Sequence, residues 1–131
     1  MGKPLKISII ICTYNRARYL FDTLRHIAEN DFPTRHYEIV LIDNNSTDHT
    51  IATCQRFEKA FPEICFRYFL EQSQGLSFAR NRGMKEARGE LLVFLDDDAF
   101  VHKDYLKNLK HQFTAHPDMA AFGGKITPLY E

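Results

Sequence analysis

Short runs of apolar residues alternate with longer stretches of helical periodicity along this chain. Four runs have the length and the Ile, Val, Leu and Phe content of buried strands, and they lie at residues 7–12, 37–42, 65–70 and 91–95. Apolar residues that recur every three or four positions predict helices between and after these runs, at residues 20–28, 51–61, 76–87 and 105–113. Because parallel strands need crossovers, this alternation predicts an α/β fold with an open, mainly parallel sheet and helices on both faces.

The same pattern predicts which residues are buried. The run at residues 91–95 is apolar at every position, which is typical of a strand buried on both faces. We expect Ile51 on the core side of the second helix, and Phe78 and Met84 on the core side of the third. Residues 119–122 predict one more strand.

A polar cluster follows three of the four predicted strands. These clusters occupy residues 13–16, 43–48 and 96–98. Ligands of open parallel sheets bind outside the carboxyl ends of the strands. We therefore expect the three clusters to converge on one edge of the sheet and to form a binding site.

Three consecutive aspartates carry the most specific chemistry. Asp96, Asp97 and Asp98 repel one another, and sheet packing gives no reason to place them after five apolar residues. Mg²⁺ and Mn²⁺ prefer oxygen ligands and relieve such repulsion. In extended backbone Asp96 and Asp98 point to the same side while Asp97 faces away, so the first and last aspartates are the candidate metal ligands. The alternative is a solvated acidic turn that caps the following helix.

Other side chains of the clusters suit a phosphorylated nucleotide. Asp43 could accept from a base N–H or a ribose hydroxyl, although its cluster would serve equally as a turn or a helix cap. Tyr14 offers a ring for stacking on a base or for packing against the sheet edge. Guanidinium groups match phosphate geometry, and the candidates for a diphosphate, each of which could instead form a surface ion pair, are Arg16, Arg80 and Arg82.

The composition limits the classes of partner and compartment. The 131 residues carry 17 Lys and Arg and 17 Asp and Glu, and this zero net charge argues against a nucleic-acid partner. The three cysteines form an odd set without Cys-x-x-Cys spacing, which argues against a disulfide framework or a zinc site. The apolar stretch near the N-terminus is too short for a membrane span and has no signal cleavage site. We expect a cytoplasmic protein, with peripheral attachment to the inner face of the membrane as the alternative.

Four segments, in order and spacing, resemble the inverting glycosyltransferases of family 2, which have the Rossmann-like GT-A fold. The segments are Ser8–Arg16, Glu38–Asp48, Gly75–Gly83 and Gly89–Asp98. The resemblance implies a nucleotide-diphosphate sugar as donor, a UDP-sugar, and Mn²⁺ or Mg²⁺ held through a DxD motif, here Asp96-x-Asp98. It also implies transfer with inversion to the hydroxyl of a saccharide, lipid-linked or other acceptor.

The resemblance further implies roles for single residues. Asp98 holds the metal together with Asp96, which also meets the ribose or the sugar, and Asp43 meets the base or the ribose. The expected donor-nucleotide-binding residues are Thr13, Tyr14, Asn15, Arg16, Asp43, Asn45, Arg80 and Asp96. The base of the family lies downstream of a point comparable to residues 123–124, so the resemblance places the catalytic base beyond Glu131.

We therefore expect residues 1–131 to form a single GT-A domain, the donor-binding half of a metal-dependent glycosyltransferase, with the acceptor half largely absent. A non-catalytic nucleotide-sugar-binding module of the same fold is the main alternative. Phosphatases of the haloacid dehalogenase type also have a strand that leads into Asp-x-Asp, but there it is the first strand. Residues 75–79 loosely resemble the nucleophile elbow of a serine hydrolase, without a strand that runs directly into the serine.

Overall fold

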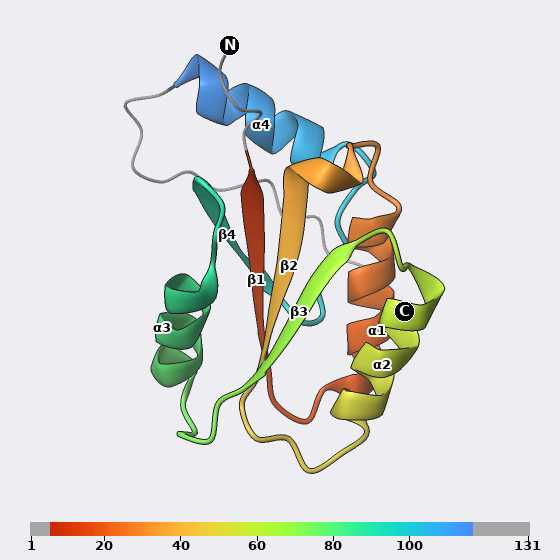
Figure 1. Cartoon of the computed structure of the whole chain (residues 1–131), viewed down its shortest axis with the longest axis vertical. Helices are drawn as coiled ribbons and strands as arrows, with labels where there is room; N and C mark the ends of the chain where they lie inside the picture. The colour runs from red at the N-terminus through yellow and green to blue at the C-terminus, as the bar shows by residue number, and fades with distance from the viewer. Residues whose placement is uncertain (1–5, 117–131) are drawn as a thin grey trace.

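The computed structural model describes residues 6–116, which form one four-stranded parallel sheet and its helices (Figure 1). In chain order the elements are β1 (Ile7–Thr13), α1 (Ala17–Ala28), the short 3-10 helix η1 (Thr34–His36), β2 (Tyr37–Asp43), α2 (Thr50–Ala60), β3 (Cys65–Leu70), α3 (Leu76–Glu86), β4 (Leu91–Asp96) and α4 (Tyr105–Ala115). The strand order is β3-β2-β1-β4, and every pair is parallel. The predicted α/β class is confirmed, while the strand expected at residues 119–122 lies outside the described residues.

The larger core lies between the sheet and three helices. The register pairs Ile9 of β1 with Ile39 of β2 and with Val93 of β4, so these side chains point to one face of the sheet. They belong to one buried cluster. The helices that complete this cluster contribute, among others, Leu24 from α1, Phe57 from α2 and Leu106 from α4.

The opposite face of the sheet is covered by α3, which confirms the prediction of helices on both faces (Figure 1). Ala79 of α3 packs on Ile10 of β1, and a Cβ atom at Gly83 would lie 2.3 Å from Cγ2 of Ile10. The helix approaches the sheet this closely because small residues form its inner face. Phe78 and Met84 are exposed as a result, and the prediction that they face the core is wrong.

Two other predictions of burial are wrong. Ile51 is exposed because it lies about 100° around α2 from Thr50, which is on the buried face. Leu92 and Phe94 of β4 are 37% and 43% exposed, although the strand was expected to be buried on both faces. β4 is one of the two edge strands of the described sheet, and α3 packs mainly on β1 and β2.

A buried carboxylate ties the segment before β4 to the rest of the sheet. Glu38 of β2 accepts hydrogen bonds from the Ser8 hydroxyl at 2.6 Å, from the Arg88 N–H at 2.8 Å and from Nη1 of Arg67 at 2.8 Å. Burial raises the pKa of Glu38, but these hydrogen bonds outweigh burial and hold the pKa below its ordinary value. The network therefore favours the ionised carboxylate.

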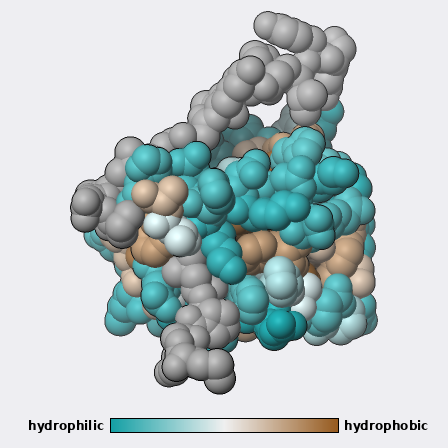
Figure 2. Space-filling view, turned by 90° about the horizontal axis from the view of Figure 1, so that it is seen from above, coloured by the Kyte–Doolittle hydropathy of each residue, from teal (hydrophilic) through white to brown (hydrophobic). Residues whose placement is uncertain are grey.

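One face of the described part is mixed in character. Seen from the end at which the strands begin, it is mostly hydrophilic, with hydrophobic side chains exposed in between (Figure 2). None of the helices between residues 6 and 116 is long and apolar enough to cross a bilayer.

Candidate functional site

The carboxyl ends of the three adjacent strands β2, β1 and β4 are level with one another. Thr13, the last residue of β1, is paired with Asp43, the last residue of β2. The preceding residue Cys12 is paired with Asp96, the last residue of β4. The three polar clusters expected at one edge of the sheet therefore start side by side.

Hydrogen bonds join the loop after β1 to the loop after β2. The Asn15 N–H donates to Oγ of Ser46 at 3.0 Å, and the Thr47 N–H donates to Oδ1 of Asn15 at 2.8 Å. Asn15 and Asn45 both have positive φ, at 53° and 67°, a conformation that asparagine tolerates better than most residues. The side chain of Asn15 thus braces the two loops against each other.

Asp48 extends this connection to the start of α1. Its carboxylate accepts from the Ala17 N–H at 3.1 Å and from the Thr50 N–H at 3.1 Å. Burial raises the pKa of Asp48, but hydrogen bonds from the Thr50 hydroxyl and from these backbone groups outweigh it and lower the pKa overall. A carboxylate at the first turn of α1 also complements the dipole of the helix.

Asp43 is only 3% exposed, and both of its carboxylate oxygens have partners. Oδ1 accepts from the Ser46 N–H at 2.8 Å, and Oδ2 accepts from the Tyr68 hydroxyl at 2.5 Å. Burial and then this hydrogen bond to Asp43 raise the pKa of Tyr68, which stays a donor. Each carboxylate oxygen has a second lone pair, so Asp43 keeps the capacity to accept from a ligand.

Asn44, which the sequence analysis did not single out, fixes the loop between β3 and α3. Its side-chain amide donates to the carbonyl oxygens of Glu71 at 3.1 Å and of Ser73 at 2.9 Å, and its Oδ1 accepts from the Gly75 N–H at 2.9 Å. Gly75 has φ of 136°, a conformation that L side chains rarely adopt. A glycine before a predicted helix was the only signal in the sequence for this loop.

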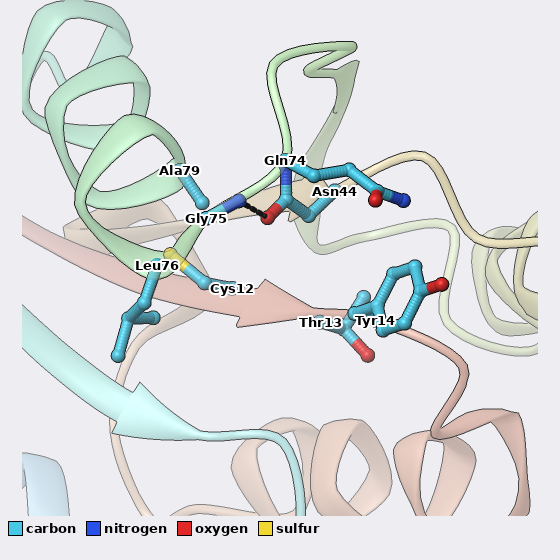
Figure 3. A pocket seen from close by; sticks show the side chains of 8 residues that line it. All are labelled: Cys12, Thr13, Tyr14, Asn44, Gln74, Gly75, Leu76 and Ala79. Atoms are coloured by element: carbon cyan, nitrogen blue, oxygen red, sulfur yellow. Dashed lines mark hydrogen bonds between the residues drawn. The ribbon is translucent and has the colours of Figure 1, made fainter.

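A cavity of about 350 Å³ opens between this loop and the end of β1 (Figure 3). Figure 3 shows the Asn44 amide next to the Gly75 N–H, with Thr13 and Tyr14 at the end of β1. The residues that line the cavity are Cys12, Thr13, Tyr14, Asn44, Gln74, Gly75, Leu76 and Ala79. Tyr14 is 49% exposed, so its ring is available to a ligand. Burial raises the pKa of Cys12 to about 11, which keeps its thiol neutral.

The aspartates after β4 form a turn. The strand ends at Asp96, the next two residues are a turn, and the Ala99 N–H donates to the Asp96 carbonyl at 3.1 Å. Strand alternation therefore does not extend to Asp98, contrary to the reasoning from extended backbone. Asp96 and Asp98 are nevertheless exposed, whereas Asp97 is half-buried. Burial raises the pKa of Asp97, and a hydrogen bond from the Thr13 hydroxyl to Oδ2 at 2.9 Å opposes this effect.

The candidate arginines have different surroundings. Nη1 of Arg16 lies 3.3 Å from Oδ2 of Asp98, in an ion pair whose side chains are about half exposed. Arg80 is exposed, and its charge acts on Cys12 and lowers the pKa of that thiol against burial. Arg82 forms ion pairs with Glu71 at 3.5 Å and with Glu86 at 3.3 Å, so its guanidinium is engaged on the β3 side of α3.

The donor set of the turn suits a hard divalent cation that a phosphorylated ligand shares. Within residues 6–116 no group of three or more His, Cys, Asp or Glu residues is arranged to hold a metal by itself. Asp96 and Asp98 supply two exposed carboxylates, and Asp98 has only a weak surface partner in Arg16. Mg²⁺ is typically held by one or two carboxylates, substrate phosphates and water, and these residues fit that arrangement.

Comparisons with known proteins agree on one family. The sequence matches the profile described as glycosyl transferase family 2 over residues 8–127. The chain is 32% identical, over 79% of its residues, to the poly(ribitol-phosphate) beta-N-acetylglucosaminyltransferase TarS of Staphylococcus aureus, and this match spans 18% of TarS.

Two solved structures resemble the fold closely. A mannosyltransferase of Pyrobaculum calidifontis in complex with GDP-Man and Mn²⁺ has a TM-score of 0.80 and 29% identity, with 85% of this chain and 33% of that chain covered. TarS residues 1–349 of S. aureus in complex with UDP have a TM-score of 0.78 and 30% identity, with 95% and 38% covered. The chain therefore spans well under half the length of these relatives.

Proposed function

The chain belongs to glycosyl transferase family 2, and from this premise we propose that it binds the nucleotide-diphosphate sugar donor of a glycosyl transfer reaction. The observation that carries the proposal is the convergence of the loops after β1, β2 and β4. Arg16 meets Asp98 across 82 residues of sequence, and Asn15 meets Ser46 and Thr47 across about 30. Family membership also decides against the phosphatase and hydrolase alternatives.

The nucleoside is proposed to bind in the cavity at the end of β1. Uracil would stack on Tyr14, and Asp43 would accept from a base N–H or a ribose hydroxyl with its remaining lone pairs. Asn44 would act indirectly, because its hydrogen bonds set the position of the 71–75 loop that forms the other wall. The relatives with GDP-Man and with UDP support a nucleotide donor, and we propose UDP for this chain.

The diphosphate is proposed to lie over the turn after β4. Asp98 and Asp96 would hold Mn²⁺ or Mg²⁺, which when bound supplies a Lewis acid for the departing diphosphate. Arg16 at the start of α1 and Arg80 on α3 would bind phosphate oxygens through their guanidinium groups. The Mn²⁺ in the mannosyltransferase supports a divalent cation as cofactor.

The reaction we propose is transfer of the sugar to an acceptor hydroxyl with inversion at the anomeric carbon. A carboxylate base would deprotonate the acceptor, and we propose that this base lies beyond Glu131. We propose that residues 1–131 belong to one GT-A domain that supplies the donor half of the site, in the cytoplasm.

A thermal-shift screen with Mn²⁺ tests the proposed function. UDP and UDP-sugars should raise the melting temperature of the chain more than uridine does, because uridine lacks the diphosphate. GDP and ADP serve as controls for the base. A protein that is folded but shows no shift with any nucleoside diphosphate would contradict the proposal.

A further inference from the structure

One buried threonine of α1 makes an unusual hydrogen bond. A threonine inside a helix ordinarily gives its hydroxyl to the carbonyl one turn earlier. Thr53 and Thr114 do so here, with bonds of 2.9 Å and 2.8 Å to residues four positions back. Thr23 instead donates at 2.7 Å to the carbonyl oxygen of Asp97, 74 residues away, and it is completely buried.

The same aspartate is held a second time through its side chain. The hydroxyl of Thr13, a residue only 2% exposed at the end of β1, donates to the Asp97 carboxylate at 2.9 Å. Asp97 is therefore fixed at its backbone by α1 and at its side chain by β1, one of the two inner strands of the described sheet. Both anchors lie on regular elements, and neither needs a ligand to form.

The consequence concerns the two neighbours of Asp97. Asp97, the middle one of the three aspartates, is held inward at two points, and Asp96 and Asp98 are left exposed on either side of it. Surrounding hydrogen bonds of this kind orient metal ligands and set the affinity of a site. Carboxylates on a turn without such anchors would lose conformational entropy when a cation binds.

We propose that Thr23 and Thr13 are positioning residues that hold the turn at Asp97 and so preorganise Asp96 and Asp98 for a divalent cation. This inference rests on the proposed function, because it concerns the same cation. Thr23 acts on a backbone carbonyl, which every residue type has. Its contribution therefore does not depend on the side chain at position 97.

The test uses the whole chain in the presence of saturating UDP. Binding of Mn²⁺ is measured by electron paramagnetic resonance. Thr23→Val removes the hydroxyl at nearly constant shape, whereas Thr23→Ser keeps it. Thr53→Val is the matched control, because it also removes a buried helical hydroxyl but one that bonds within its own helix. Thermal melting in the absence of metal records the stability of each variant.

We expect Thr23→Val to weaken Mn²⁺ binding about tenfold, the lower end of what loss of a supporting partner costs a metal site. Thr23→Ser should restore the affinity, and Thr53→Val should keep it despite a comparable drop in melting temperature. Thr13→Val should repeat the effect of Thr23→Val from the other anchor. If wild type binds Mn²⁺ with UDP and folded Thr23→Val binds it equally well, this inference is overturned and the proposed function stands. If folded wild type binds no Mn²⁺, both are overturned.

Discussion

Arg16 and Asp98 form an ion pair at 3.3 Å although one follows the first strand and the other follows the fourth. This contact brings a cation that suits phosphate next to a carboxylate that suits a metal, at the edge of the sheet where ligands of open α/β folds bind. An exposed pair of this kind contributes only about 0–1 kcal/mol, so a divalent cation at Asp98 could replace Arg16 at little cost.

The exposed and the anchored aspartate should respond differently to loss of charge. Asp98→Asn should weaken UDP binding in the presence of Mn²⁺ by on the order of tenfold or more, because it removes a proposed ligand. Asp97→Asn is the matched variant, since the amide oxygen can still accept from the Thr13 hydroxyl. Calorimetric titration of both variants decides the matter, and a larger loss for Asp97→Asn would mean that the roles within the turn are assigned in the wrong order.

The Tyr14 ring should carry part of the affinity for the base. Stacking of a base on an aromatic ring is worth about 1–3 kcal/mol, so Tyr14→Ala should weaken UDP binding by roughly 5- to 150-fold. Tyr14→Phe keeps the ring and should bind UDP nearly as wild type does. Equal affinities of wild type and Tyr14→Ala would place the base elsewhere in the cavity.

A methyl group added at Gly83 should destabilise the fold. The new Cβ would lie 2.3 Å from Cγ2 of Ile10, and overpacking typically costs about 1–3 kcal/mol. Alanine gains about 1 kcal/mol over glycine in helix propensity, which offsets only part of this cost. Asn81→Ala, at an exposed position of the same helix, should be neutral or stabilising. Urea denaturation compares the two, and a Gly83→Ala protein as stable as wild type would show that α3 can move away from β1.

Acid should weaken the fold through Glu38. Its pKa in the folded protein lies below the ordinary value of 4.5, so the stability it contributes is present above about pH 4.5 and is lost as the pH falls through the folded pKa. Glu38→Gln should lower the free energy of unfolding at pH 7 and reduce its dependence on pH below about 4.5. Glu58→Gln, at an exposed position of α2, should leave both unchanged. If the free energy of unfolding falls with pH in parallel for wild type and Glu38→Gln, Glu38 is not the source of the acid sensitivity.

The sequence predicted the fold because its periodicity was unambiguous. Short runs rich in Ile and Val marked β1 and β2, and the polar clusters after β1, β2 and β4 lie at one edge as expected. The burial of α3 was misjudged because close packing there selects small residues. Large side chains such as Phe78 were therefore displaced to the surface.

The architecture of the site was only partly predictable. Asn44 lies in the polar cluster after β2, but its role depends on three hydrogen bonds to a loop about 30 residues away, which the sequence does not reveal. The sequence does indicate that Thr23 is unusual, because it is a polar residue at the same helical spacing as the core residues Leu20, Leu24 and Ile27. Periodicity alone could not show that its hydroxyl faces Asp97, because that contact joins elements 74 residues apart.

Calorimetric titration of UDP into the chain, with and without Mn²⁺, tests the central claim most directly. If the loops after β1, β2 and β4 hold a cation-bridged diphosphate, Mn²⁺ should strengthen UDP binding strongly, and uridine should show no such dependence. If the protein is folded and the titration of UDP gives the same negligible heat with and without Mn²⁺, the account is contradicted.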